Sequence, residues 1–403
     1  MINKIKDLAS NLHEEIRTIR RHIHQNPELS FQEFNTQNYV WQQLEDAGIA
    51  NKQKIANTGI VAIIEGKNPA KRIVALRGDM DALPIIEAND VPYKSKNDGV
   101  MHACGHDSHT AILMGVAEVL SGMKKDLKGT VKFIFQPAEE GPPFGEVGGA
   151  EQMVKEGVLE NPKVEAIFGL HISAGSENGV IEYKPGATMA AVDQLDIVVK
   201  GKQAHGANPW LGVDPIVTSS QIITGLQTIV SRNVNITEDP AIVTVGAIHG
   251  GIRQNIIPES VKMIGTIRTF GVEQRELVHK RIKEIATNIA ESAGAKADVT
   301  IGTGYPVTFN NVALVEKMLP TLQAVNGKER VRQIPAHTGA EDFSFFQQKV
   351  PGFFFFLGAR PADKKSATEV AAHHTPDFYL EESEFQVGVK ALSHLVVDYF
   401  EKK

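Results

Sequence analysis

Two side chains that bind transition metals lie close together in the segment 101–109, MHACGHDSH. Cys104 and His106 are two residues apart, and in extended backbone such side chains face the same way. A thiolate and an imidazole aimed at one point suit Zn²⁺ and related borderline metals. Either residue alone is typical of a buried thiol or a helix cap. Three histidines and an aspartate in one short segment favour a metal site, with His109 as a further candidate ligand.

Two adjacent glutamates offer a second kind of chemistry. Glu139 and Glu140 follow the apolar run 130–135 and Pro137. Neighbouring carboxylates point in different directions, so one can bind a metal ion while the other transfers protons. On the pair alone a solvated loop is the simpler explanation, because carboxylates are mostly exposed. The pair therefore gains its meaning from other ligand-type residues.

Further ligand-type residues follow other strand-like runs of the sequence. These candidates are Asp79 and Asp81 after 73–76, His171 after 164–170, and His373 or His374 in a polar loop. A lone histidine at such a place can equally be a hydrogen-bonded core residue or part of an exposed loop, without binding metal. Open α/β sheets, however, place their sites at the carboxyl ends of strands. The set as a whole therefore indicates one site at one edge of a sheet.

The elements that must position these residues alternate along the chain. Apolar periodicity predicts helices near 2–23, 32–47 and 110–120, the first of them as a single stripe from Ile2 to Ile23. Runs rich in β-branched residues predict the strands 60–64, 73–76, 130–135 and 164–170. This alternation predicts an α/β fold with a mainly parallel sheet and helices on both faces.

The pattern changes after Gly186. Strands are expected at 192–199, 241–247, 261–270 and 297–301, a turn at 249–251, and helices after Asp214 and at 273–291. The order β-α-β-β-α-β is that of a ferredoxin-like domain. We therefore expect two domains: a catalytic domain of residues 1–186 and 307–403, and an inserted α+β domain of residues 187–306.

The inserted domain carries its own candidate residues. His205 lies in the glycine-containing segment 201–207, where it can approach a ligand closely. Asn255, in the segment 253–258, and Arg268 could bind an anionic group, since arginine pairs well with carboxylates. A flexible surface loop and ordinary surface charges are the simpler explanations for these three residues.

Composition excludes several classes of protein. The chain has 403 residues, 42% of them hydrophobic, and a net charge of −6, so a nucleic-acid partner is not expected. Phe353–Leu357 is an apolar block too short to span a bilayer, and the first residues lack the apolar core of a signal peptide. The single cysteine cannot form an internal disulfide. We expect a soluble cytoplasmic protein without a membrane partner.

Ten short motifs together resemble the aminoacylase/carboxypeptidase family of metal-dependent amidohydrolases. The branch indicated is that of hippurate hydrolases, N-acyl-amino-acid amidohydrolases and plant auxin-conjugate hydrolases. The resemblance covers nearly the whole chain, and CGHD, PAEEG and a downstream GLH form its most specific combination. The motifs are RRHIHQNPELSFQE, RGDMDALPI, MHACGHDSHTA, FQPAEEG, GLH, GKQAHGANPW, RQNIIP, GTIRTF, GAEDFSFF and HHTPDF.

The resemblance implies two divalent ions per subunit (Zn, Mn, Co or Ni). The metal ligands it implies are Cys104, His106, Glu140, His171 and His374. His374 rather than His373 matches the family histidine that precedes a small residue and proline. Asp81 would support the ligands without binding metal, whereas Asp79 stands where many relatives have a ligand histidine, so its metal role stays open. The loop after Glu140, GPPFGEVGGAEQM, is longer than in many relatives.

Roles for the remaining residues also come from the resemblance. Glu139 would be the general base and acid, and Asn255 and Arg268 would contact the substrate. His205 is expected to act across the interface of a homodimer, in the site of the other subunit, so the inserted domain would serve as lid and dimerisation domain. Metal, substrate and a second copy of the chain are therefore the implied partners.

The implied reaction is hydrolysis of the amide bond of N-acyl amino acids, such as hippurate-like conjugates or N-acetyl amino acids. Within the family, a dipeptidase or carboxypeptidase and an N-acetyl-diaminopimelate deacetylase are alternatives. A metal- or peptide-binding protein without turnover is the alternative outside enzymology. Glu139 argues against it, because a protein that only binds needs no proton-transferring carboxylate beside the ligands.

Overall fold

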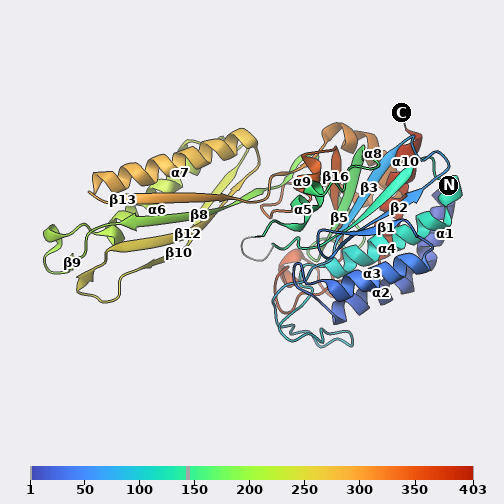
Figure 1. Cartoon of the computed structure of the whole chain (residues 1–403), viewed down its shortest axis with the longest axis horizontal. Coiled ribbons are helices and arrows are strands. Elements are labelled where there is room, and N and C mark those ends of the chain that lie inside the picture. The colour runs from blue at the N-terminus through green and yellow to red at the C-terminus, as the bar shows by residue number, and fades with distance from the viewer. Residues whose placement is uncertain (1, 142–145, 403) are drawn as a thin grey trace. The chain divides into compact units, whose positions relative to one another are not determined.

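The computed structural model describes residues 2–141 and 146–402, which form two units (Figure 1). The first unit comprises Met1–Gly186, Phe309–Pro335 and Asp342–Lys403, and the second comprises Ala187–Thr308 and Ala336–Glu341. The second unit begins directly after Gly186, and it also includes the segment 336–341. This segment joins the second unit because the Ala190 amide donates to the carbonyls of His337 and Gly339, at 3.1 and 2.9 Å.

The first unit is built on an eight-stranded mixed sheet, most of whose neighbouring pairs are parallel. The mainly parallel α/β sheet predicted from the sequence is confirmed, with antiparallel pairs where β1 meets β2, β2 meets β4 and β16 meets β6. In sheet order the strands are β1 (Lys52–Ile55), β2 (Gly59–Glu65), β4 (Thr130–Gln136), β3 (Ile73–Asp79), β5 (Ala166–Ser173), β16 (Gly352–Gly358), β6 (Ile181–Tyr183) and β15 (Val331–Gln333).

Helices cover the sheet, and in Figure 1 α2, α3 and α4 lie side by side along it. Alternate strand residues such as Phe353 and Phe355 pack into the main apolar core with residues of α4 and α10. Phe354 faces the other way and contacts Phe343, beside α9. The helices of this unit are α1 (Ile2–Asn11), α2 (His13–Gln25), α3 (Phe34–Asp46), α4 (His106–Gly122), α5 (Gly149–Lys155), α8 (Val312–Asn326), α9 (Ser344–Gln347) and α10 (Phe385–Glu401).

The first predicted helix is in fact two helices. The chain leaves helical geometry at Leu12, where φ is −86° and ψ is 0°. The Ile16 amide still donates to the Leu12 carbonyl at 2.9 Å, so the apolar stripe continues across the break. Periodicity therefore reports which face is buried but does not detect a one-residue interruption.

The second unit has the predicted ferredoxin-like order. Its antiparallel sheet runs β10 (Ala241–Gly250), β12 (Ser260–Thr269), β8 (Ala191–Lys200) and β13 (Lys296–Thr303). Helices α6 (Pro215–Arg232) and α7 (Val272–Ser292) pack on it around one apolar core. The Asp214 carboxylate caps α6 by accepting the amides of Ile216 and Val217. The turn expected at 249–251 starts later than predicted, because β10 remains paired with β12 as far as Gly250.

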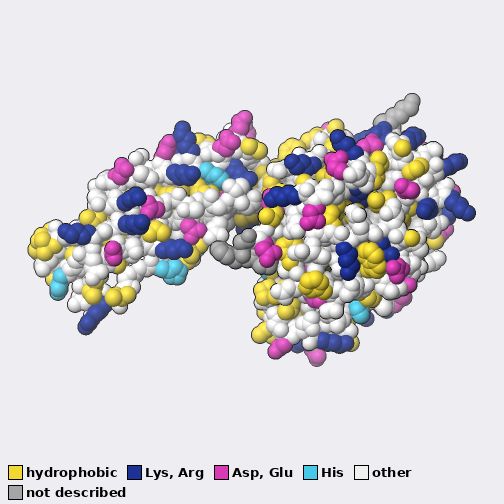
Figure 2. Space-filling model, in the orientation of Figure 1, with side chains coloured by type: hydrophobic (Ala, Val, Ile, Leu, Met, Phe, Trp, Pro, Cys, Tyr) yellow, Lys and Arg dark blue, Asp and Glu magenta, His cyan; other side chains and the backbone are white. Residues whose placement is uncertain are grey.

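Two short strand pairs, the first of them antiparallel, complete the strands. They are β9 (Ala204–His205) with β11 (Ile256–Ile257), and β7 (Gly186–Met189) with β14 (Thr308–Asn310). Among the helices that the structure describes, none is long and apolar enough to cross a bilayer. On each unit, acidic and basic side chains are interspersed over the face shown in Figure 2.

Candidate metal centre

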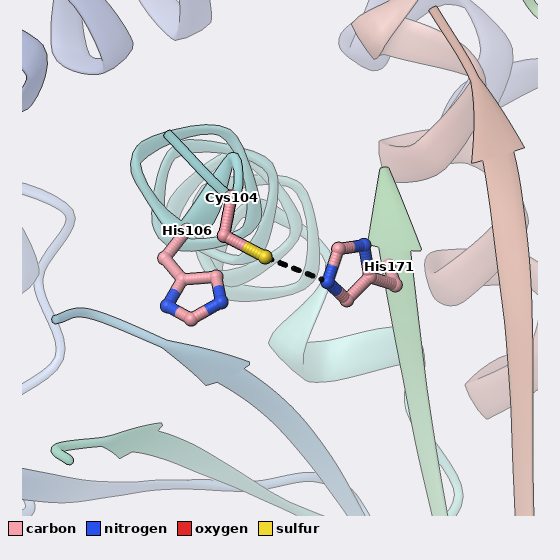
Figure 3. Close-up of side chains that lie close together, drawn as sticks. All are labelled: Cys104, His106 and His171. Carbon is pink, nitrogen blue, oxygen red and sulfur yellow. Dashed lines mark hydrogen bonds between the residues drawn. The ribbon is translucent and has the colours of Figure 1, made fainter. Parts of the chain in front are cut away.

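Four segments of the first unit bring the predicted ligands together. Cys104 and His106 lie at the start of α4, His171 lies inside β5, Glu140 follows β4, and His374 lies in the loop after β16. In Figure 3 the Cys104 thiol at the start of α4 points toward the His171 ring on β5, and the His106 ring lies on the other side of Cys104. His171 lies near the carboxyl end of β5 and Glu140 comes soon after β4, and these strands run parallel to β3, so both side chains are at the same edge of the sheet.

The reason for the convergence of Cys104 and His106 differs from the predicted one. The backbone between them is not extended: Gly105 has a φ of +99°, and His106 is already helical. A Cβ at Gly105 would lie 2.3 Å from Cγ2 of Ile172. A glycine is therefore required here both for the left-handed conformation and for the close approach to β5.

The ligand atoms lie within a few ångströms of one another. The Cys104 Sγ is 3.4 Å from Nε2 of His171 and 3.3 Å from Nε2 of His374. The Glu140 Oε1 is 3.2 Å from Nε2 of His374 and 3.8 Å from Nε2 of His106. All five predicted ligands thus lie close together, and they include two groups of three that could each hold an ion: Cys104, His106 and His171, and Cys104, Glu140 and His374.

Two of the histidines direct one ring nitrogen into the cluster because the other is already used. The His171 Nδ1 donates to the carbonyl of Ile172 at 2.6 Å, which leaves Nε2 facing the thiol. The His106 Nδ1 donates to the Asp81 carbonyl at 2.9 Å. Its Nε2 is buried and has no hydrogen-bond partner among the described residues. Metal-binding histidines are oriented in this way, by a bond from the ring nitrogen that does not hold the metal.

Two other histidines nearby have both ring nitrogens occupied. The His373 Nδ1 donates to the Cys104 carbonyl at 3.1 Å, and its Nε2 accepts the Ala174 amide at 3.3 Å. The His109 Nδ1 donates to Asp79 at 2.6 Å, and its Nε2 accepts the Ile172 amide at 2.8 Å. Neither ring offers a nitrogen to an ion in this arrangement, which favours His374 over His373 and argues against His109 as a ligand.

The two aspartates after β3 have different surroundings. Asp79 is fully buried, and its oxygens accept hydrogen bonds from His109 and Arg77. The Asp81 carboxylate accepts the backbone amides of Glu139 and Glu140, each at 3.0 Å, and contacts Nδ1 of His106 at 3.3 Å. Asp81 therefore fixes both adjacent glutamates and one of the histidines at once.

The electrostatics of the cluster call for a cation. Burial, reinforced by the negative charges of Glu140 and Glu139, raises the pKa of the Cys104 thiol well above its usual range. Burial alone would lower the pKa of His106, but Asp79 and Asp81 outweigh it and raise this pKa to about 10. A divalent ion would reverse both effects by stabilising the thiolate and the neutral imidazole. This set of sulfur, nitrogen and oxygen donors fits Zn²⁺, Mn²⁺, Co²⁺ or Ni²⁺.

The second unit holds the other predicted site residues. His205 is exposed in β9, and its Nδ1 accepts the Ala207 amide at 3.0 Å. The proton of the neutral ring is therefore on Nε2, which is a donor. Asn255 is exposed beside β11, and its carbonyl accepts the Gly206 amide at 2.8 Å, so these two segments are tied together. Arg268 is half-buried on β12, and burial lowers its pKa.

Sequence reasoning missed Glu33, a fully buried carboxyl whose Oε1 accepts the amide of Ala138, directly before the two glutamates. Glu33 is the last residue of the motif RRHIHQNPELSFQE, but nothing in that motif reveals its partner, which is 105 residues away. The loop after Glu140 is expected to be longer than in many relatives. Part of it, residues 142–145, lies outside the described residues.

Comparisons with known proteins agree with this geometry. The model of the peptidase family M20/M25/M40 matches residues 75–398. An N-acetylcysteine deacetylase of Bacillus subtilis is 37% identical over 96% of this chain and 97% of its own. Thermostable carboxypeptidase 2 of Saccharolobus solfataricus is 37% identical over the full length of both chains. The Bacillus subtilis YXEP protein, described as a dinuclear metal-binding peptidase, superposes with a TM-score of 0.81 at 35% identity over 98% of this chain and 100% of its own.

The family match covers most of the chain, and the relatives are similar over nearly its whole length. The fold of both units and the donor set described above agree with those matches. The chain therefore belongs to the peptidase family M20/M25/M40, as a metal-dependent enzyme of its amidohydrolase branch.

Proposed function

We propose that the protein hydrolyses the amide bond of N-acyl amino acids, giving a carboxylic acid and a free amino acid. The observation that carries the proposal is the pair of glutamates held by Asp81. Glu140 turns toward His374, whereas Oε2 of Glu139 lies 3.7 Å from Nε2 of His106 and Oε1 lies 3.5 Å from the Asp342 amide. Glu140 can thus bind metal while the neighbouring Glu139 accepts and donates protons beside the same metal centre.

Five residues would hold two divalent ions, namely Cys104, His106, Glu140, His171 and His374. When bound, such ions polarise an amide carbonyl and lower the pKa of a water molecule. Glu139 accepts the proton of the attacking water and later passes it to the nitrogen of the departing amine, as a general base and then a general acid. Asp81 keeps Glu139 and His106 in register for this transfer.

The proposal also gives roles to three residues of the second unit. The proton on Nε2 of His205 makes this ring a donor suited to the oxyanion that forms when the carbonyl is attacked. Arg268 and Asn255 would bind the α-carboxylate of the amino-acid product. We further propose that the protein is a homodimer in which His205 serves the site of the other subunit.

A carboxypeptidase or dipeptidase is the second candidate, supported by the Saccharolobus solfataricus relative. It would use the same proton transfers and differ in the pocket that receives the acyl group. Deacetylation of N-acetyl-diaminopimelate is a narrower form of the first candidate, and binding without turnover is the non-enzymatic one. The N-acetylcysteine deacetylase relative supports the first candidate.

The test is a substrate panel assayed with defined metals. N-acetylcysteine, N-acetylmethionine, hippurate, N-acetyl-diaminopimelate and an unmodified dipeptide are each incubated with protein loaded with Zn²⁺, Mn²⁺, Co²⁺ or Ni²⁺, and the release of free amine is measured against a chelated control. We expect release from an N-acyl amino acid and none after chelation. Cleavage of the dipeptide alone would replace the proposal with the peptidase candidate, and no release from any substrate would favour binding without turnover.

A further inference from the structure

The turn that carries the two glutamates is held by an unusual set of backbone hydrogen bonds. Three successive amides, those of Ala138, Glu139 and Glu140, all donate to buried carboxyl groups. The first donates to Oε1 of Glu33 at 2.9 Å, and the other two donate to the two oxygens of Asp81 at 3.0 Å each. The chain between β4 and Glu140 is therefore fixed by two side chains, of which Asp81 was predicted and Glu33 was not.

Ala138 is the residue of this turn that most needs a partner. Its φ is +49°, in the left-handed region that residues other than glycine rarely adopt. Its side chain is fully buried, so water cannot replace a lost partner of its amide without a rearrangement. A residue in this conformation persists only when its surroundings hold it there.

The opposite side of the turn is closed by a tight backbone contact. The Gly149 amide donates to the Ala138 carbonyl at 3.1 Å, and a Cβ at Gly149 would lie 1.7 Å from the Pro137 carbonyl oxygen. The turn is thus clamped between Glu33 on one side and Gly149 on the other. Because the turn is held on both sides, it cannot accommodate a change in the Glu33 hydrogen bond locally. Such a change therefore shifts the next residues, Glu139 and Glu140.

Glu33 itself is held in place by a second partner. It precedes α3 and is fully buried, and its Oε2 is hydrogen-bonded to the hydroxyl of Thr58, which is also fully buried. Each oxygen of the Glu33 carboxyl therefore has one partner, the Ala138 amide or the Thr58 hydroxyl. This division of roles allows the two bonds to be removed separately.

We propose that Glu33 is a positioning residue for hydrolysis: as the acceptor of the Ala138 amide it sets the direction of Glu139 and Glu140. The inference rests on the proposed function in one respect, that Glu139 and Glu140 serve the reaction. Glu33 acts as an acceptor and not through a negative charge. Burial and the charge of Asp81 raise the pKa of Glu33 to about 8, and a protonated carboxyl still accepts the amide and donates to Thr58.

Glutamine is the variant that separates the acceptor from the charge. Glu33→Gln keeps a carbonyl oxygen for the Ala138 amide and offers its NH₂ group to the Thr58 hydroxyl, so we expect at least half of the wild-type kcat. Glu33→Ala leaves a buried amide without a partner in a turn that positions two reacting carboxylates. We expect it to lose roughly 10²-fold in kcat, the scale for a small misplacement of a catalytic group, with little change in KM.

Thr58→Val is the matched control. It removes the other partner of the same buried carboxyl and leaves the bond to Ala138 in place. Both Glu33→Ala and Thr58→Val should lower the melting temperature, but only Glu33→Ala should lower kcat per folded, metal-loaded molecule. A role confined to stability predicts the opposite result, in which both variants keep wild-type kcat once correctly folded.

A second readout does not depend on activity. Amide hydrogen exchange of residues 138–140 in the metal-free protein should be faster in Glu33→Ala than in wild type, and unchanged in Glu33→Gln. If wild-type protein hydrolyses no N-acyl amino acid, the proposed function fails while this exchange measurement still tests the positioning role. Wild-type exchange in Glu33→Ala, or a Glu33→Gln variant as impaired as Glu33→Ala, would overturn the inference.

Discussion

The metal centre of the first unit and the His205 segment of the second unit are built in opposite ways. At the metal centre, side chains that are mostly buried, with His374 as the exposed exception, hold one another, as when Asp81 fixes His106, Glu139 and Glu140 together. His205 is exposed, and its position depends on a two-residue pairing with β11 and one hydrogen bond from Ala207. In the first region the ligand-type side chains are held by hydrogen bonds to one another and to the backbone, whereas the second region presents a donor at a surface.

This difference predicts which substitutions should affect metal binding and which should affect only turnover. Removing a residue of the buried region disturbs partners that also hold the ligands. Removing an exposed residue of the second unit leaves the metal centre as it is. The comparison therefore predicts that metal content and kcat respond together in the first region, Glu139 excepted, and separately in the second.

Glu139→Gln should give the largest loss of turnover. Glutamine keeps the size of the side chain but cannot accept the proton of water, so we expect kcat to fall by roughly 10²–10⁴-fold with metal content unchanged. Steady-state kinetics together with elemental analysis of the same preparation measure both quantities. Turnover within a few-fold of wild type would remove Glu139 from the mechanism.

His205→Ala should lower kcat by about 10²–10³-fold, the scale for loss of one donor to an oxyanion, with wild-type metal content. His249→Ala is the matched control, since His249 is another exposed histidine of the same unit. Equal kinetics for the two variants would show that His205 has no special role.

Mixed dimers test whether His205 acts in its own subunit or in the other one. Chains carrying His205→Ala and chains carrying Glu139→Gln are each expected to be nearly inactive as pure preparations. If His205 acts in the site of the other subunit, mixing them restores one intact site per mixed dimer and recovers part of the activity. No recovery in a mixture that has exchanged subunits would place His205 in the site of its own chain.

Asp81→Asn should weaken metal binding by roughly 10–100-fold, the usual cost of losing a residue that orients a ligand. An amide can accept from only one of the two glutamate amides that Asp81 now holds, so we also expect a lower kcat. Titration with a metal-sensitive dye measures the affinity. An affinity equal to wild type would mean that the buried region is less interdependent than the geometry implies.

The smallest effect concerns a buried charge cluster that belongs to the second unit and serves stability. Asp193 accepts hydrogen bonds from Arg275 and His279, and although burial alone would raise the pKa of Asp193, these bonds lower it. A lowered carboxyl pKa stabilises the fold above the unfolded value of about 3.9, and this contribution is lost as the pH falls below it. Asp193→Asn should therefore lower the melting temperature at neutral pH, with a difference that shrinks below about pH 4, and leave metal content intact. A difference that grows in acid would refute the account.

The sequence predicts the centre well where residue type alone carries the information. Cys104 and His106 stand out by their types and spacing, whereas only the family resemblance distinguishes Glu140 from Glu139 as the ligand. Which histidine keeps a nitrogen available is different, because it depends on contacts with the backbone of β5 and of Cys104. The same holds for Glu33, whose partners Thr58 and Ala138 are distant in sequence.

For the fold, too, some features could be predicted from the sequence and others could not. Hydrophobic periodicity locates the core helices and the inserted β-α-β-β-α-β domain, because burial of one face determines both the pattern and the structure. It misses the break at Leu12, since a change in the backbone at one residue leaves no mark on residue type.

The most direct test of the central claim is anomalous X-ray scattering from crystals of the protein loaded with Zn²⁺ or Mn²⁺. The account predicts two adjacent peaks bounded by Cys104, His106, Glu140, His171 and His374, with ligand distances of about 2.0–2.3 Å for Zn²⁺. No peak should be bound by His109 or His373, whose ring nitrogens are already occupied. A peak ligated by Asp79 and His109, or no peak at the Cys104 thiol, would contradict it.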